Sequence, residues 1–444
     1  MNEASELFLS LGRASAQWLL NPFYYIAVIM IVLQYRRQIY LERKLFHTRL
    51  HSLGGETLRS IGWGLAGGLA ASLLLGLIGA SLAPEAVYWI WGAALLGVLF
   101  RMRFLCIAYA TGLIAVLQYA SSFIDSASAP NWMNGWMNSL LASLQSISMS
   151  SLLAFVAVLH LIEGLLIRFQ GKRMMTPLFL EGKRGKIVGG YQLQGFWPVP
   201  LFMFLPLSMN ETASWTSMLN GELWSGGWQL AALPVMIGFL DLTKTRTPNV
   251  KLQESSLRLI LYSVVVFALA VAAELLPSLS LLAGLLCLLL HEALIYWSYN
   301  TETKGSALFV HDAKGLRILG IMPNSPAEQL GIRPGEIIAR VNDKIVRTKE
   351  DLHTALRMNP AFCKLEIIDL NGENRFLQRA MFAGENYQLG ILLSPDDEAE
   401  YYLEFEQPKS IFAYVRLKLT GLFQNERRSE NAANLYSDDI FAGK

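Results

Sequence analysis

The sequence predicts an α-helical multi-spanning membrane domain followed by a small α+β domain, and three observations support this prediction. The 444 residues are 53% hydrophobic and only 16% charged, which is too apolar for an ordinary soluble enzyme. Up to residue 298, long apolar stretches alternate with basic segments. From about Thr301 onward, charges are frequent and apolar residues alternate with polar ones, as in short strands. We therefore expect a membrane domain at residues 1–298, a soluble domain at 301–395 and a tail at 396–444.

Seven apolar stretches are interpreted as membrane-crossing helices, because a span needs about 20 mostly apolar residues. They cover residues 15–35, 61–83, 86–100, 104–123, 147–167, 257–276 and 279–298. Two shorter stretches, 196–207 and 228–240, are expected to be kinked spans or a re-entrant pair, because the first contains Pro198, Pro200 and Pro206. The sequence thus predicts seven to nine spans.

The charge of the connecting segments predicts their side of the membrane. Residues 34–60, 168–195 and 241–258 are basic, whereas 121–139 and 208–227 contain no Lys or Arg. Since basic loops stay in the cytoplasm, the N-terminus is expected outside and the soluble domain inside. If both short stretches fail to span, two crossings vanish together and this assignment is unchanged. The basic residues indicate topology and not nucleic-acid binding.

One face of the second apolar stretch carries only small residues at four-residue intervals. These residues are Gly64, Gly68, Ser72, Gly76 and Ala80. A face of this kind lets another element approach the helix closely. It predicts either close packing within the helical bundle or a seam between two copies of the chain.

Ionisable residues inside the apolar stretches are candidates for chemistry, because burying them in lipid is costly. His160 and Glu163 lie one turn apart, and His291-Glu292 begins a segment similar to the His-Glu-x-x-His motif of intramembrane metalloproteases. The fifth position of that segment is Ile295, so the helix offers a metal only one imidazole. Two of the three cysteines (Cys106, Cys287, Cys363) also lie in apolar stretches. We expect polar packing here, with no metal, no cofactor and no catalytic site.

The soluble domain is predicted to contain short strands around one helix. The strands are expected at Ala307–Val310, Leu316–Met322, Glu336–Val341, Lys364–Leu370, Arg375–Arg379 and Tyr387–Leu393. The helix is expected at Lys349–Met358, where Leu352, Ala355 and Leu356 form one apolar stripe.

The segment from Ile321 to Asn342, with its Asn-Ser-Pro-Ala and Gly-Ile-Arg-Pro-Gly-Glu runs, resembles the signature of PDZ domains. Ser325 suits a helix N-cap before Pro326, and Gly331 suits a left-handed helix end. Glu336 stands where the family usually has Asp, which is expected to weaken one turn hydrogen bond. The resemblance implies a partly open antiparallel β-barrel with two helices.

PDZ domains add an extended peptide beside an edge strand and a facing helix. By position, the resemblance assigns the groove to Gly305, Ser306, Ala307, Leu308, Phe309, Val310, Leu352, Ala355 and Leu356. The segment Lys304–Ala307 departs from the family's Gly-Leu-Gly-Phe loop, which favours an internal peptide or a protein surface over a C-terminal carboxylate. An alternative loop is Leu389-Gly390-Ile391, since bacterial PDZ domains often shuffle strand order.

The tail combines apolar and basic residues between Lys409 and Phe423. This pattern is compatible with an interfacial amphipathic helix at 409–423. A helix packed on the soluble domain or a disordered tail fits the same residues.

The whole layout, with the basic stretch 41–50, the loop 181–186 and a terminal PDZ-like domain, resembles the MinJ family of polar and septal division proteins of Gram-positive rods. The resemblance implies a membrane adaptor, enriched at septum and poles, that links the scaffold DivIVA to MinD of the Min system. The alternative is a PDZ-containing intramembrane protease or a degenerate relative of one.

Overall fold

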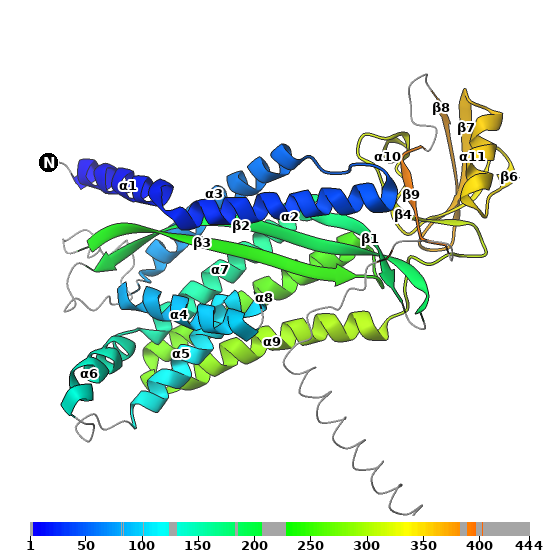
Figure 1. Ribbon diagram of the computed structural model, residues 1–444. Coiled ribbons are helices and arrows are strands. Elements are labelled where there is room, and N and C mark those ends of the chain that lie inside the picture. Colours follow the sequence, from blue (N-terminus) through cyan, green and yellow to red (C-terminus); the bar gives the residue numbers. More distant parts are fainter. Residues whose placement is uncertain are drawn as a thin grey trace, which may run out of the picture.

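The computed structural model describes residues 3–80, 82, 84–100, 102–123, 131–182, 185–206, 228–381, 389–396 and 402. Long helices and two long strands run roughly side by side, and a smaller β-rich domain lies at one end, opposite the N-terminus (Figure 1). The expected tail helix at 409–423 lies outside the described residues.

Four described helical segments are long and apolar enough to cross a membrane. They are built on α3 (Leu53–Ile78), α7 (Met149–Gln170), α8 (Pro248–Leu275) and α9 (Ser280–Lys304). The helices α1 (Glu3–Leu20) and α2 (Pro22–Phe46) meet at a bend of 57° and together form a fifth candidate. The α7 helix lies at the centre, with Leu152, Leu153 and Ile167 fully buried.

A helical hairpin occupies the region that the sequence assigned to two further spans. The helices α4 (Pro84–Phe100) and α5 (Ile107–Ser121) have 17 and 15 residues and are joined by a short 3₁₀ helix, Met102–Leu105. At 1.5 Å per residue they are about 25 and 22 Å long, less than the ~30 Å hydrocarbon core. Cys106 at the hairpin tip contacts His160, halfway along α7. The pair therefore turns back in the middle of the helical layer. The helix α6 (Asn131–Gln145) follows it.

The two short apolar stretches are strands, so the expectation of kinked or re-entrant helices was wrong. The strands β1 (Met175–Glu181), β2 (Ile187–Pro206) and β3 (Trp228–Thr243) form an antiparallel sheet in the order β1-β2-β3. Proline is excluded from helix interiors by its missing N–H and its ring, and the repeated prolines of β2 therefore favour the extended chain. Alternate side chains of β2 are buried, namely Trp197, Val199, Leu201 and Met203.

The small face of α3 is occupied by β2. A Cβ added to Gly64 or Gly68 would overlap the carbonyl oxygen of Pro198 or Pro200. The Ser72 hydroxyl accepts a hydrogen bond from the Phe202 N–H at 2.9 Å. Gly76 is buried as well, whereas Ala80 lies beyond the end of α3 at Ile78 and is buried there. Of the two predicted uses, the structure shows close packing within the chain, with a strand and not a helix as the neighbour.

The C-terminal domain contains an open antiparallel sheet in the order β8-β7-β5-β4-β9, with the short β6 beside β5. Its elements in chain order are β4 (Leu316–Ile321), α10 (Pro326–Gln329), β5 (Ile337–Val341), β6 (Lys344–Ile345), α11 (Lys349–Met358), β7 (Phe362–Ile368), β8 (Asn374–Ala380) and β9 (Ile391–Leu393). The expected helix is confirmed, and so are five of the six expected strands. Residues 307–310 form only an isolated bridge, between Phe309 and Gly189.

Turn and cap residues account for the path between β4 and β5. The Ser325 hydroxyl accepts from the Glu328 N–H at 3.4 Å and caps α10, and Gly331 ends that helix at φ 69°. The carboxylate of Glu336 accepts from the Arg333 N–H at 3.0 Å and pairs with Arg375 at 2.7 Å. The turn hydrogen bond expected to be weak is therefore made, because the longer side chain of Glu reaches back across the turn.

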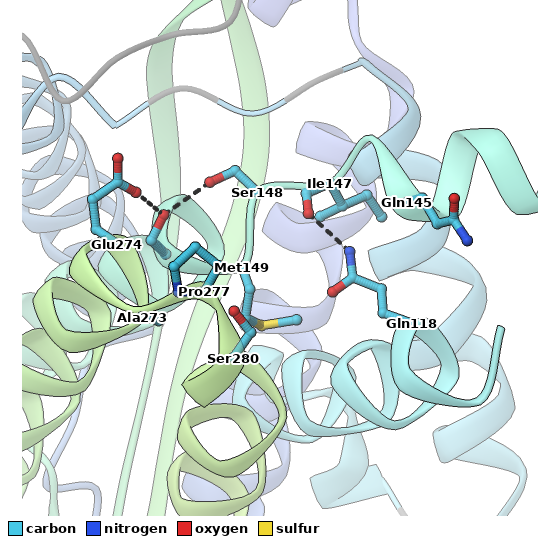
Figure 2. A pocket seen from close by; sticks show the side chains of 10 residues that line it. Gln118, Gln145, Ile147, Ser148, Met149, Ala273, Glu274, Pro277 and Ser280 are labelled. Carbon is cyan, nitrogen blue, oxygen red and sulfur yellow. Dashed lines mark hydrogen bonds between the residues drawn. The ribbon is translucent and has the colours of Figure 1, made fainter. Parts of the chain in front are cut away.

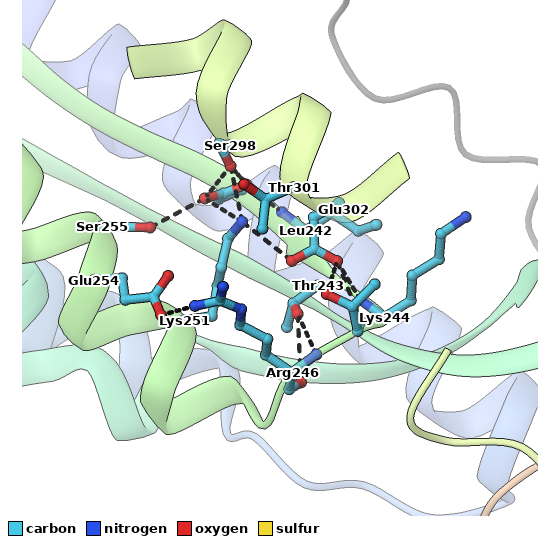
Figure 3. Close-up of polar contacts among 12 residues, drawn as sticks. Leu242, Thr243, Lys244, Arg246, Lys251, Glu254, Ser255, Ser298, Thr301 and Glu302 are labelled. Atoms are coloured by element: carbon cyan, nitrogen blue, oxygen red, sulfur yellow. Dashed lines mark hydrogen bonds and ion pairs between the residues drawn. The ribbon is translucent and has the colours of Figure 1, made fainter. Parts of the chain in front are cut away.

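A buried ion-pair network fastens the end of β3 to α8 and α9, next to the C-terminal domain (Figure 3). The ammonium of Lys251, only 1% exposed, lies 3.2 Å from Glu302 and 3.5 Å from Asp241 and donates to Ser298 at 2.8 Å. The second oxygen of Glu302 accepts from the N–H groups of Lys244 and Thr245, at 3.0 and 3.2 Å. The network fixes the place where α9 leads into the C-terminal domain.

Candidate peptide-binding site

The strand β9 forms one end of the C-terminal sheet in the described part of the chain. It pairs with β4 on one side, through Ile391 and Ile321, Leu392 and Gly320, and Leu393 and Ile318. A terminal strand of this kind presents unpaired backbone groups and is a template for a further strand. The edge is only three residues long, so it suits a short extended segment.

The helix α11 packs into the same apolar core as this edge. Leu352, Ala355 and Leu356 belong to one cluster with Leu389 and Ile391. All five side chains are 8% exposed or less, so they pack in the core of the domain and do not form an open surface. Helix and edge strand are thereby held in a fixed relation, which is the geometry that strand addition requires.

The loop before β9 has a conformation that orients its amide groups. Leu389 and Gly390 both have positive φ, 56° and 74°. The Leu389 carbonyl accepts from Ala327 N–H at 2.9 Å, and the Gly390 carbonyl accepts from Met322 N–H at 2.8 Å. In a trans peptide the N–H points opposite to the C=O. The N–H groups of Gly390 and Ile391 therefore point away from α10 and β4, although both residues are buried.

Two pairs of hydrogen bonds hold α11 in place. Thr348 accepts from the Asp351 N–H at 3.1 Å, and the Asp351 carboxylate accepts from the Thr348 N–H at 2.9 Å, which forms a capping box. The Asn342 side chain donates to the Ala355 carbonyl at 2.9 Å and accepts from the Lys364 N–H at 3.0 Å. The Val-Asn end of the recognised motif thus ties β5, β7 and α11 together.

Backbone hydrogen bonds also determine the charge at the start of α11. The N–H groups of Arg347 and Thr348 hold the pKa of the Asp351 carboxyl below its usual value. The carboxylate therefore stays ionised at the positive end of the helix dipole, where a negative charge is favourable.

The groove residues that were assigned by position between Gly305 and Val310 lie elsewhere. Gly305 ends α9, and the Leu308 N–H donates to the Lys244 carbonyl at 2.8 Å. Phe309 is fully buried, with its ring 5.5 Å from that of Tyr191. Ala307 and Val310 pack against an apolar cluster of β1, β2 and β3, and Ser306 is exposed. This assignment was wrong, because the segment is the anchor of the domain on the first sheet. The alternative loop, Leu389-Gly390-Ile391, lies at the sheet edge.

A cavity lies at the end of the helical region opposite the PDZ-like domain (Figure 2). It has a volume of about 410 Å³ and is lined by the α6–α7 connection and the ends of α5, α8 and α9. Glu274 accepts a hydrogen bond from Ser150 at 2.5 Å, and Gln118 donates to the Ile147 carbonyl at 2.8 Å. The polar groups of this cavity bond mainly to one another, so it offers little to a ligand.

The fold and the edge define the class of protein, which is a region of long apolar helices that carries one PDZ domain. The sequence profile of the PDZ domain matches residues 317–368, from β4 to β7. PDZ domains mediate protein–protein interaction through strand addition. The prediction from the Ile321–Asn342 motif is therefore confirmed.

The chain is homologous to a particular division protein over most of its length. It is 28% identical over 396 residues to the "Cell division topological determinant MinJ" of Bacillus subtilis (strain 168), which covers 88% of this chain and 97% of the relative. It is 26% identical over 281 residues to the "Probable cell division topological determinant MinJ" of Lacticaseibacillus paracasei, which covers 58% of this chain and 72% of that relative. These similarities support a division-related adaptor role.

Proposed function

We propose that this chain is a multi-pass membrane adaptor whose PDZ domain faces the cytoplasm and binds division proteins through the β9 edge. The observation that carries the proposal is the terminal strand β9, which shares an apolar core with α11 and follows a loop whose Gly390 and Ile391 amides point away from α10 and β4. A peptide with a free C-terminus fits this loop, because a carboxylate accepts hydrogen bonds from backbone N–H groups.

The distribution of charge supports the proposed orientation. The basic segments after α2, after α7 and before α8 all lie at the end that carries the PDZ domain (Figure 1). Positive loops mark the cytoplasmic side. Protease accessibility at residue 350 tests this point, and cleavage from outside intact cells would overturn it.

The partners are proposed from the MinJ relatives and the architecture. We expect a DivIVA-like scaffold at the poles and septum and a MinD-like protein of the Min system, joined through this chain to restrict septum formation to midcell. A fluorescent fusion of the full chain should concentrate at septa and poles. Deletion of residues 301–395 should leave the fusion in the membrane but abolish recruitment of a partner. Uniform membrane signal with normal division would contradict the proposal.

The half-buried His353 provides a finer test, because it follows Leu352 on α11 at the border of the packed face. Substitution His353→Glu in the full chain should weaken capture of the DivIVA-like or MinD-like protein at least tenfold. The matched control is Thr354→Glu, which places the same charge on the exposed side of the helix. Equal capture by both variants would exclude α11 as a wall of the site.

We also propose that the activity is binding and not proteolysis. Glu292, the residue that a metalloprotease mechanism would use as its base, accepts from the Tyr109 hydroxyl at 2.5 Å and pairs with Arg103 at 3.0 Å. These contacts hold its carboxylate within the helical packing. Metal-dependent cleavage of a membrane substrate that is lost in His291→Ala would overturn this part.

A further inference from the structure

Three potential metal ligands that are far apart in the sequence meet inside the helical region. Cys106 precedes α5, His160 lies in α7 and His291 lies in α9. Their ligand atoms all lie within 4.8 Å of one another, and no other group of three His, Cys, Asp or Glu residues in the described part of the chain is arranged in this way. The Cys106 Sγ is 3.3 Å from Nε2 of His160 and 3.6 Å from Nε2 of His291. We propose that these three side chains bind one d¹⁰ metal ion of the Zn²⁺ or Cu⁺ class.

The spacing of the three atoms agrees with such an ion. With bonds of about 2.3 Å to sulfur and 2.05 Å to nitrogen, tetrahedral coordination places sulfur and nitrogen ligands about 3.5 Å apart. The two observed separations, 3.3 and 3.6 Å, lie on either side of this value. Thiolate and imidazole are the ligand types that select Zn²⁺ and Cu⁺.

The hydrogen bonds of the imidazoles leave the right nitrogens for a metal. Nδ1 of His160 lies 2.8 Å from the Val156 carbonyl, which can only accept, so Nδ1 carries the hydrogen. Its Nε2 therefore presents a lone pair to Cys106. Nδ1 of His291 is buried and has no hydrogen-bond partner in the described part of the chain, so nothing there ties its Nε2 to the protonated form.

The surroundings suit a bound cation. Arg103 and Glu292 neutralise each other in an ion pair beside the cluster. The Cys106 thiol, which loses its proton to solvent when a metal binds, then supplies a negative charge to the ion. The ring of Tyr262 packs 5.0 Å from that of His160, and the ring of Tyr109 packs 5.2 Å from that of His291. These rings form an apolar shell, which strengthens the bond between ion and ligands.

A bound ion would have a structural consequence. Three protein ligands leave one position of a tetrahedral ion open to water or a further donor. The ion would fasten the tip of the α4–α5 hairpin, which does not cross the helical layer, to the middle of α7 and α9. The site is thereby distinct from the PDZ edge and independent of its function.

Elemental analysis of the full chain, purified in detergent without added metal, tests the proposal. We expect about one equivalent of zinc or copper per chain, and the element found distinguishes Zn²⁺ from Cu⁺. Substitutions Cys106→Ser and His160→Ala should reduce the content more than tenfold. The control Cys287→Ser removes a nearby buried thiol that lies 3.3 Å from the Tyr262 hydroxyl and outside the cluster, and it should keep the metal.

Cobalt substitution gives a second readout that does not depend on how well the variants purify. Replacement of the native ion by Co²⁺ should produce a sulfur-to-cobalt charge-transfer band that is present in the Cys287→Ser control and absent in Cys106→Ser. Failure of the wild-type chain to retain or take up Zn²⁺, Cu⁺ or Co²⁺ would overturn the proposal. Equal metal content in wild type and folded Cys106→Ser protein, which marks an adventitious ion only, would also overturn it.

Discussion

The two sheets of this protein differ in what covers their edges. The β1-β2-β3 sheet lies among helices, with α1 and α2 next to β3 and α3 across β2. The PDZ sheet ends in β9, whose outer edge has no strand beside it in the described residues. An uncovered sheet edge within lipid would leave backbone N–H and C=O groups without hydrogen-bond partners. In water, such groups bond to water until another strand pairs with them. The comparison teaches that helices enclose the first sheet, whereas the second ends in a strand that pairs only with β4 in the described residues.

The largest expected effect comes from breaking the ion-pair network at the end of the covered sheet. Substitution Lys251→Met leaves the buried Glu302 and the partly buried Asp241 without their cation, and removal of one partner of a buried pair costs about 3–5 kcal/mol. Thermal unfolding of the full chain in detergent measures this loss. The double variant Lys251→Met/Glu302→Gln should recover part of the stability. No recovery would mean that packing, not charge, dominates at this site.

A smaller loss is expected where α3 touches β2. The substitution Gly68→Ala introduces a Cβ that overlaps the Pro200 carbonyl, and overpacking of this kind costs about 1–3 kcal/mol. Gly62 on the same helix has open space around its Cβ position. Gly62→Ala should therefore leave the unfolding temperature unchanged or raise it, because Ala favours helix. Equal behaviour of the two variants would contradict the close helix–strand contact.

A substitution in the loop before β9 should change the shape of this sheet edge. In Gly390→Ala the Cβ would overlap Ser325, in addition to the strain of a positive φ. We expect a loss of about 1–2 kcal/mol and weaker peptide binding. Gly331→Ala has a similar φ of 69° but open space, and it measures the strain alone. If both variants bind partners equally, the loop does not shape the site.

The helix cap beside the edge should contribute less. Thr348→Ala removes the side-chain acceptor of the Asp351 N–H, and loss of such a cap costs about 1 kcal/mol. Urea unfolding followed by a probe in the PDZ domain measures the change. Thr354→Ala, an exposed position in the same helix, is the control and should change stability by less than half as much.

The smallest effect concerns pH. Because the pKa of Asp351 is lowered in the folded protein, its ionised form stabilises the fold above the ordinary value of 3.8, and this contribution is lost as the pH falls through the lowered pKa. Asp351→Asn should therefore be slightly less stable than wild type at neutral pH. The difference should shrink in acid. A difference that grows below pH 4 would contradict the assignment.

The sequence predicts the elements of the PDZ sheet better than those of the first sheet, and the reason is physical. The PDZ elements follow from local signals such as the Ser325 cap, the Gly331 helix end and the apolar stripe of α11, which act over a few residues. The β2–β3 hairpin was missed because its nearly continuous apolar sequence fits a buried strand as well as a short helix. The prolines and the alternation from Trp197 to Met203 were the signals that could have identified it.

The functional residues show the same limit. The edge strand was predicted at Leu308–Val310 from its place before β4, but pairing is decided in space, and the strand that pairs with β4 at the end of the sheet is β9. The cluster of Cys106, His160 and His291 has no sequence signal at all, because its members are separated by 54 and 131 residues. The expectation of no metal came from spacing within single helices, and such spacing does not show which side chains from distant segments lie together.

The strand β2 is one continuous element that connects the PDZ domain to the far end of the helical region. Gly189 and Tyr191 at its start hold the PDZ domain through Phe309 and Leu319, and the same strand continues for 20 residues to Pro206 at the far end of the helices. At about 3.3 Å per residue this is roughly 65 Å of extended chain, with a strand on each side over part of its length. A pull on the PDZ domain would be transmitted along this strand to the far end of the helices. One continuous strand can thus couple the PDZ domain mechanically to the opposite end of the helical region.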